Sequence, residues 1–335
     1  MVARSQHRWQ TPIWKRELAG AFTRPADLLA HLGLEPALCA DTESIVQQFP
    51  LLVPRGFAAL MEPGNPDDPL LRQVLPTAAE DAWMPGFETD PVGDAAAVIA
   101  PGLLQKYAGR ALLLATGACA MHCRYCFRRH FPHDRETAQG QRWRAAVAML
   151  AERRDIDEVI LSGGDPLMLD DQALDSLIEQ LEQIPHLRRL RLHTRLPVML
   201  PSRVTEALCD RLANSSLKTV VVLHVNHPRE LGDAATSALT ALRDRRLPLF
   251  NQAVLLHGVN DDADTLTALV ERLFDLGVQS YYLHMLDPVA GAAHFAVPEI
   301  EARALMEHLR ERLPGYLLPR LVREVPGAAS KRPIA

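Results

Sequence analysis

Lysine is scarce in this sequence of 335 residues. Only four occur, namely Lys15, Lys106, Lys218 and Lys331. Acidic side chains outnumber basic ones, and the formal net charge is −5. A protein that binds nucleic acid through its overall charge needs the opposite balance. We therefore expect no nucleic-acid partner.

Long hydrophobic runs are also missing. The most apolar stretch, Ala111 to Met121, is too short to span a bilayer. The first residues, Met1 to Gln10, are polar and lack the apolar core of a signal peptide. The sequence therefore predicts a soluble, cytoplasmic protein without membrane contact.

Cysteine is sparse and unevenly placed, since three of the five cysteines are crowded together. Cys39 and Cys209 stand alone, and we interpret them as small buried hydrophobic residues. This spacing does not resemble a disulfide framework, so it favours a reducing compartment.

The crowded cysteines, Cys119, Cys123 and Cys126, form a C-x3-C-x2-C triplet. Grouped thiolates suit a soft metal centre. Three ligands are one fewer than a closed zinc site or a fully ligated iron–sulfur cube takes. Spacing alone leaves two interpretations open: a histidine completes a zinc site, or one iron of a 4Fe-4S cluster has no protein ligand. The candidate histidines are His122, His130 and His133.

Residues 1–105 differ in composition from the rest of the chain, because twelve of the 25 prolines precede residue 102. We predict short helices, beginning near Thr23 and Asp41, and extended connectors that wrap the main domain. Trp83 and Phe87 indicate that this region docks rather than staying disordered.

Residues 106–313 alternate between apolar runs and helical patterns. The predicted strands are Ala111–Thr116, Glu158–Leu161, Leu190–His193, Thr219–Val225, Leu249–Leu256 and Tyr281–Leu286. The predicted helices are Arg142–Arg153, Asp171–Gln183, Ser202–Asn214, Ala234–Arg245, Asp264–Leu276 and Glu299–Leu313. Six such units predict an α/β fold with a parallel sheet, either doubly wound or curved into a barrel. Residues 314–335 form a short C-terminal segment.

Unusual polar segments follow these strands. They are Ser162-Gly163-Gly164-Asp165, His193-Thr194-Arg195, His224-Val225-Asn226-His227, Asn251-Gln252 and Asp287. The C-terminal ends of parallel strands form one rim, so we expect these segments to converge with the cysteine triplet. The paired glycines either let the backbone approach a ligand or form a tight turn that Asp165 caps.

The triplet followed by the glycine-rich segment resembles the radical S-adenosylmethionine (SAM) enzymes. Further stretches resemble the lysine 2,3-aminomutase family within that group, over roughly residues 60–335. They are Lys106–Leu114, Cys126-Phe-Arg128-Arg129, Val225-Asn-His-Pro and Asn251–Asp261. The resemblance is greatest to the short form that supplies β-lysine for modification of elongation factor P. It implies a six-unit partial TIM-type barrel that holds a 4Fe-4S cluster, SAM and pyridoxal 5′-phosphate (PLP).

The resemblance also implies roles for single residues. Lys331 matches the lysine that carries PLP, and Lys106, Tyr107 and Arg110 match positions that hold the PLP phosphate. Arg128 matches the arginine for the substrate carboxylate. Asp287 and Glu324 match two acidic residues for the distal ammonium of L-lysine, although the family has Asp where this chain has Glu324. Implied cofactor contacts are Ser162, Gly163, Gly164, Asp165, His224 and Gln252.

The partners implied by the resemblance are a reducing electron donor, elongation factor P and its lysine ligase. The sequence leaves open whether the protein forms a homo-oligomer. Two alternatives stay open as well. One is an aminomutase acting on free lysine or another amino acid in metabolism, and the other is a non-catalytic zinc or iron–sulfur module that recruits a translation protein.

Overall fold

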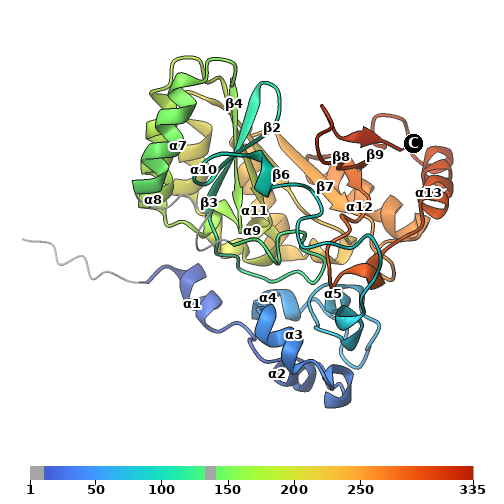
Figure 1. Cartoon of the computed structure of the whole chain (residues 1–335). Helices are drawn as coiled ribbons and strands as arrows, with labels where there is room; N and C mark the ends of the chain where they lie inside the picture. The colour runs from blue at the N-terminus through green and yellow to red at the C-terminus, as the bar shows by residue number, and fades with distance from the viewer. Residues whose placement is uncertain (1–10, 133–140, 335) are drawn as a thin grey trace, which may run out of the picture.

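One curved sheet of ten strands organises the protein (Figure 1). A computed structural model describes residues 11–132 and 141–334. Strand order in the sheet follows chain order from β1 to β10. The strands are β1 (Val98–Ala100), β2 (Leu103–Tyr107), β3 (Arg110–Thr116), β4 (Glu158–Gly163), β5 (Arg189–Thr194), β6 (Lys218–Leu223), β7 (Leu249–Val254), β8 (Val278–His284), β9 (Arg320–Arg323) and β10 (Arg332–Pro333).

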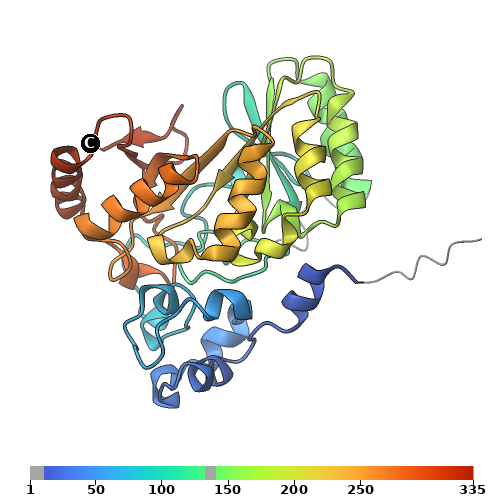
Figure 2. The ribbon, with the colours of Figure 1, turned by 180° about the vertical axis from the view of Figure 1, so that it is seen from behind.

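Helices cover the outer side of the sheet, and a separate group lies against one end of it (Figures 1 and 2). The outer helices are α7 (Gln141–Glu152), α8 (Asp171–Glu182), α10 (Glu206–Ala213), α11 (Asp233–Asp244), α12 (Ala263–Asp275) and α13 (Glu299–Arg312). The short helix α9 (Leu196–Met199) follows β5. The N-terminal helices are α1 (Ile13–Ala19), α2 (Pro25–His31), α3 (Glu43–Gln48), α4 (Arg55–Ala58) and α5 (Pro69–Arg72).

The predicted α/β partial barrel is confirmed, with all six predicted strand–helix units in order. Strands β3 to β9 run parallel. Antiparallel pairs extend both edges, with β1 and β2 before β3, and β10 after β9. The hairpin of β2 with β3 and the seventh parallel strand β9 were not predicted. The sheet therefore runs past residues 106–313 in both directions.

Several predicted boundaries are displaced, and after β6 a side chain replaces the backbone pairing. Strands β6, β7 and β8 each end two residues earlier than predicted. Beyond β6, the N–H of Val225 donates to Oδ1 of Asn251 (2.9 Å), and its carbonyl accepts from Nδ2 of the same side chain (3.0 Å). The predicted helix from Ser202 begins only at Glu206, where the hydroxyl of Thr205 caps it.

Burial alternates along β5 and β7, so the barrel interior is polar. In β5, Leu190 and Leu192 are fully buried, whereas Arg191 and His193 are half-buried on the opposite face. Gln252 of β7 lies on a half-buried face too, with its amide 3.5 Å from Nδ1 of His193. The interior therefore has polar side chains available for a ligand.

The N-terminal region packs onto the sheet and shares its hydrophobic core. Phe57 in α4, with Leu70 and Leu71 in α5, is buried in the same cluster as the barrel residues. Trp83 does not take part in docking, contrary to the prediction, since it is 83% exposed. Helix α2 begins at Pro25, one residue later than a cap at Thr23 would place it.

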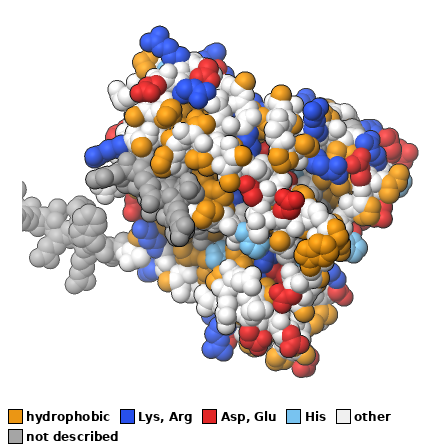
Figure 3. Space-filling model, viewed as in Figure 1, with side chains coloured by type: hydrophobic (Ala, Val, Ile, Leu, Met, Phe, Trp, Pro, Cys, Tyr) orange, Lys and Arg blue, Asp and Glu red, His pale blue; other side chains and the backbone are white. Residues whose placement is uncertain are grey.

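The surface mixes residue types. On the face shown in Figure 3, acidic, basic and hydrophobic side chains are interspersed. Among the described residues, none of the helices has both the length and the apolar character needed to cross a membrane.

Candidate functional site

The three cysteines lie on the loop that follows β3, which we call the cysteine loop (residues 117–128). All three thiols are free. Burial, with a smaller contribution from the neighbouring thiols, raises the pKa of Cys119 well above its usual range and that of Cys126 to about 11. Metal binding at such thiols therefore releases protons. The loop gathers three sulfur ligands in one place.

Gly163 and Gly164 let the end of β4 come close to the cysteine loop. Gly163 has a φ of +124°, and a Cβ there would lie 2.2 Å from the carbonyl oxygen of Thr116. A Cβ at Gly164 would lie 2.2 Å from the carbonyl oxygen of Ala118. The approach expected of these glycines is thus made to the chain's own backbone. Their contact with SAM stays a prediction.

Asp165 joins the ends of β4 and β5. Its carboxylate accepts hydrogen bonds from the Thr194 hydroxyl (2.8 and 2.9 Å), the Arg195 N–H (2.7 Å) and the Leu167 N–H (3.0 Å). Burial raises the pKa of Asp165 to about 6, although these hydrogen bonds favour the ionised form. The capping alternative is therefore present in the structure, and a cofactor contact of Asp165 stays a prediction.

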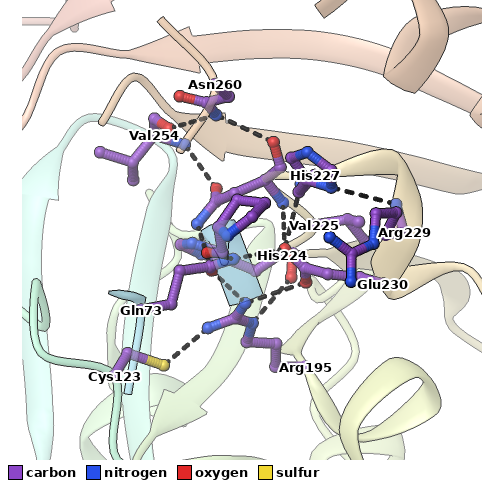
Figure 4. Close-up of polar contacts among 12 residues, drawn as sticks. Gln73, Cys123, Arg195, His224, Val225, His227, Arg229, Glu230, Val254 and Asn260 are labelled. Atoms are coloured by element: carbon purple, nitrogen blue, oxygen red, sulfur yellow. Dashed lines mark hydrogen bonds and ion pairs between the residues drawn. The ribbon is translucent and has the colours of Figure 1, made fainter. Parts of the chain in front are cut away.

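Arg195, at the end of β5, connects four segments of the chain (Figure 4). Its Nη1 donates to Sγ of Cys123 (2.7 Å) and to the hydroxyl of Tyr125 (2.6 Å). Its Nη2 donates to Oε1 of Gln73 (2.8 Å) and pairs with Oε2 of Glu230 (2.9 Å). We call these five residues the Arg195 network. It ties the N-terminal region and the segment after β6 to the cysteine loop.

Glu230 completes this network from a fully buried position. Its Oε1 accepts hydrogen bonds from the N–H of Asn226 (3.1 Å), the N–H of His227 (3.0 Å) and Nε2 of Gln73 (3.1 Å). The carboxylate therefore fixes the 224–227 segment beside the cysteines. Glu230 and Gln73 were not predicted, because each lies in a stretch without a recognisable motif.

A second buried carboxylate holds the other side of the cysteine loop. Glu80, from the N-terminal region, accepts hydrogen bonds from Nε (2.9 Å) and Nη2 (2.6 Å) of Arg124. It also accepts one from Nη2 of Arg129 (2.7 Å). All three side chains are almost fully buried. The N-terminal region thus clamps the loop by charge as well as by packing.

Four ion pairs connect the cysteine loop to the C-terminal segment, and we call them the ion-pair series. Nε of Arg128 pairs with Oδ2 of Asp94 (2.7 Å), and Oδ1 of Asp94 pairs with Nζ of Lys106 (2.6 Å). Nζ of Lys106 lies 3.5 Å from Oε1 of Glu324, and Oε2 of Glu324 pairs with Nζ of Lys331. The series crosses from β2, near one edge of the sheet, to the segment after β9, near the other. Asp94 was not predicted.

Lys331 is a half-buried residue rather than part of a frayed tail. Its Nζ lies 5.9 Å from the centre of the Tyr282 ring, and its side chain is 23% exposed. Burial raises the pKa of Asp287 to about 7, while the Lys331 charge opposes this shift and Glu324 adds to it. The attraction of Lys331 and Lys106 outweighs burial and lowers the pKa of Glu324. Asp287 therefore titrates near neutrality beside an ionised Glu324.

Tyr107 and Arg110 lie on the hairpin of β2 and β3. The Arg110 guanidinium lies 4.6 Å from the centre of the Tyr107 ring. Burial and the nearby Glu324 raise the pKa of the Tyr107 hydroxyl, which therefore stays protonated. The structure thus places Tyr107 near Glu324, and it includes Lys106 in the ion-pair series. Arg110 lies over the face of the Tyr107 ring.

Neutral histidines occupy the interior between the cysteine loop and Lys331. Burial and the Arg195 charge lower the pKa of His224 to about 3, and its ring stacks on Tyr125 at 5.8 Å. Burial also lowers the pKa of His193 and of His284. Nε2 of His193 is buried without a hydrogen-bond partner among the described residues. This atom offers a hydrogen bond to a ligand held in the interior.

The histidines of the zinc alternative are engaged with the backbone. Nδ1 of His122 lies 2.7 Å from the carbonyl oxygen of Pro50, and Nε2 of His130 lies 3.0 Å from that of Ala290. His133 lies outside the described residues. Within residues 11–132 and 141–334, no group of three or more His, Cys, Asp or Glu side chains is placed to hold a single metal ion.

Comparison with known proteins shows the superfamily and the family to which the chain is similar. Residues 113–270 match the Radical SAM superfamily. The chain is 49% identical over 323 residues to the L-lysine 2,3-aminomutase of Escherichia coli (strain K12), covering 96% of this chain and 94% of that protein. It is 44% identical to the Haemophilus influenzae protein of that name, covering 98% and 96%. It is 31% identical to the Clostridium subterminale protein of that name, covering 96% and 77%. A crystal structure of a radical SAM methyltransferase from Sphaerobacter thermophilus shares 18% identity, with a TM-score of 0.47, over 66% of this chain and 68% of that chain.

The fold and the cysteine loop are therefore those of a radical SAM enzyme. Radical SAM enzymes use a 4Fe-4S cluster and SAM, and the three free thiols of the cysteine loop equal in number the sulfur ligands that a cluster with one open iron takes. More narrowly, the chain belongs to the lysine 2,3-aminomutase family and is an isomerase.

Proposed function

We propose that the protein is a PLP-dependent L-lysine 2,3-aminomutase that converts L-α-lysine to (R)-β-lysine. The observation that carries this proposal is the ion-pair series. It places Arg128, which follows the last cysteine, in one continuous set of contacts with Glu324 and Lys331. When bound, the cluster with SAM supplies radical chemistry and PLP supplies electron delocalisation. The protein supplies position and charge.

Arg128 is suited to orient the substrate carboxylate. Its Nε is held by Asp94 at 2.7 Å, and its Nη1 donates to the Ser162 hydroxyl at 3.2 Å. Both contacts fix the plane of the guanidinium, and we assign Nη2 to the carboxylate. A guanidinium held in one plane binds a carboxylate with defined direction. Such orientation keeps the β-carbon of lysine within reach of the radical.

Asp287 and Glu324 are suited to hold the distal ammonium of lysine. Both lie close to Lys331, and the Lys331 charge favours the ionised form of both. Carboxylates at this end favour a cationic side chain and disfavour glutamate as substrate. Glu324 is one methylene longer than the family's Asp, and it still reaches the ion-pair series.

The proposed PLP site consists of Lys331 as the attachment point, with Lys106, Tyr107 and Arg110 toward the phosphate. Basic side chains and a protonated hydroxyl match a phosphate dianion. We also propose that Ser162, Gly163, Gly164, Asp165, His224 and Gln252 contact SAM or PLP. The buried Nε2 of His193, which lacks a partner among the described residues, supports a ligand in the same interior.

We further propose that the product serves the modification of elongation factor P by its lysine ligase. The supporting observation is the degree of identity, which is 49% and 44% to the Escherichia coli and Haemophilus influenzae proteins but 31% to the Clostridium subterminale protein. The reaction also needs a reducing electron donor. The test is transfer of the product to elongation factor P by the ligase, measured as a mass increase.

Product analysis tests the central proposal. Protein purified without oxygen is incubated with SAM, PLP, a reductant and L-lysine, and the products are separated on a chiral column. We expect (R)-β-lysine, and no β-isomer from glutamate. A β-isomer from glutamate or arginine in preference to lysine would overturn the substrate assignment.

The PLP attachment is tested separately. Lys331→Ala should lose the absorbance of bound PLP while retaining iron, whereas Lys218→Ala, at an exposed lysine, should keep both. An unchanged PLP spectrum in Lys331→Ala would move the attachment to another lysine, with Lys106 the next candidate.

A further inference from the structure

Arg195 brings a positive charge into contact with one of the three cysteine sulfurs. Its Nη1 donates to Sγ of Cys123 at 2.7 Å (Figure 4). The Arg195 side chain is only 10% exposed, so water screens its charge poorly. The guanidinium therefore acts on this sulfur at short range and with little attenuation by solvent.

The guanidinium is also held in one position, because each of its N–H groups has an acceptor within the protein. The five acceptors are Sγ of Cys123, the Tyr125 hydroxyl, the His224 carbonyl, Oε1 of Gln73 and Oε2 of Glu230. An arginine side chain has five N–H donors in total, so none is left for a substrate or for SAM. The position of Arg195 therefore points to an effect on the cysteine sulfur rather than to ligand binding.

We propose that Arg195 raises the reduction potential of the 4Fe-4S cluster and that Glu230 limits how far it is raised. Reduction adds one electron, and hence one negative charge, to the cluster. A nearby cation and an N–H···S hydrogen bond both favour the state with more negative charge on sulfur. Arg195 thus tunes the cluster without being a ligand of its iron.

The charges of Arg195 and Glu230 do not cancel at the sulfur. Cys123 accepts from Nη1, whereas Glu230 accepts from Nη2 on the other arm of the guanidinium. The cation touches the sulfur, and the carboxylate reaches it only through the cation. Coulomb energy falls with distance, so the nearer positive charge has the larger effect and the pair raises the potential.

This arrangement bears on the first step of the reaction, in which an external donor passes one electron to the cluster. A higher potential lets a weaker reductant fill the cluster, but it leaves less driving force for electron transfer to SAM. Opposed charges at Arg195 and Glu230 set a value between these two demands. Only the cluster used by radical SAM enzymes is needed for this effect, so it does not depend on lysine as the substrate or on PLP.

A potentiometric titration of the cluster measures the effect directly. The full chain is prepared without oxygen, and the reduced cluster is followed by electron paramagnetic resonance as the potential is lowered. SAM, PLP and lysine are left out, so that no turnover occurs. The midpoint potential reports only on molecules that carry a cluster, and a lower iron content in a variant does not alter it.

Arg195→Gln should make the cluster harder to reduce. At the midpoint potential of the unaltered protein, the ratio of reduced to oxidised cluster should fall about tenfold, which is about 59 mV for a one-electron couple. Arg195→Lys keeps the charge and should recover part of this loss. Glu230→Gln removes the opposing charge, so its midpoint potential should shift in the opposite direction.

Arg203→Gln is the matched control for the loss of a buried arginine. Arg203 is fully buried, and it donates to the carbonyl oxygens of Leu167 and Leu169 instead of to a cysteine. Its substitution should lower the Tm and leave the midpoint potential unchanged. The control thus separates a loss of stability from a change at the cluster.

Two results would overturn the proposal. Equal midpoint potentials in Arg195→Gln and Arg203→Gln would show that the guanidinium does not act on the cluster. An unchanged or lower midpoint in Glu230→Gln would assign the shifts to a loosened loop rather than to charge, and this measurement decides the question even if Arg195→Gln retains no cluster. A lack of any iron–sulfur signal in the unaltered protein would instead contradict the cluster assignment itself.

Discussion

Glu230→Gln tests whether the Arg195 network positions the cysteine loop. The substitution keeps the shape of the side chain and removes its charge. Oε1 of Glu230 accepts three hydrogen bonds, and Oε2 pairs with Nη2 of Arg195. An amide has only one acceptor oxygen, so its NH2 group must face either Arg195 or the three donors.

The expected loss of stability follows from burial. Glu230 is fully buried, and the side chain of Arg195 is 10% exposed. Removing one partner of a buried ion pair leaves the other charge without compensation, which costs about 3–5 kcal/mol. We expect the Tm to fall by roughly 5–10 °C. Because Arg195 also contacts Sγ of Cys123, we expect lower iron content in the same variant.

The assay combines thermal melting followed by circular dichroism with iron determination on protein prepared without oxygen. Glu301→Gln is the matched control, since it makes the same chemical change at an exposed position of α13. That control should melt within about 1 °C of the unaltered protein. If Glu230→Gln melts like the control and retains its iron, the network does not position the cysteine loop.

Three further predictions concern single residues. Gly163→Ala should destabilise the protein by about 2–6 kcal/mol, because strain at positive φ and overlap with the Thr116 carbonyl each contribute roughly 1–3 kcal/mol. Gly56→Ala is the control, since a Cβ at Gly56 meets open space, and it should leave the stability unchanged. Equal urea midpoints for the two variants would refute the steric argument. Burial raises the pKa of Asp287 to about 7, and the carboxyl is charged only above its pKa, so the Kd for lysine should fall as the pH rises through the pKa of Asp287. Asp287→Asn should abolish this dependence, and an unchanged profile would assign it to another group. Cys126→Ala should lose the cluster absorbance and all turnover, and retained iron with activity would contradict the cluster assignment.

Apolar runs were sufficient to predict the central strands but not the edges of the sheet. β4 and β6 each contain a run of consecutive hydrophobic residues, so their burial could be predicted from the sequence alone. β9 has only Leu321 and Val322 between two arginines, and it becomes a strand because β8 offers an unpaired edge. β2 contains Lys106 and was not predicted as a strand, since its apolar residues Leu103 and Leu104 are followed by polar ones. Pairing with a neighbour decided both elements, and that information is not local.

The candidate site divides in the same way. Residues in motifs, such as Arg128 and Lys331, could be predicted from a family resemblance. Asp94 and Glu230 have no motif, because their importance comes from partners that are distant in the chain. Asp94 lies 34 residues before Arg128, in a segment rich in proline and glycine. The arginines and lysines at the C-terminal ends of the strands indicate that buried carboxylates must accompany them, but they do not indicate which Asp or Glu residues these are.

The open side of the barrel has a mechanical consequence. Lys106 lies on β2 and Glu324 follows β9, so their separation depends on the twist accumulated over all the strands between them. A small change in twist at each step adds up across the sheet. Substitutions under α10 or α11, at the middle of the sheet, should therefore alter the distance across the opening. Directed evolution of substrate preference is then expected to select substitutions in the outer helices as well as at residues that line the barrel interior.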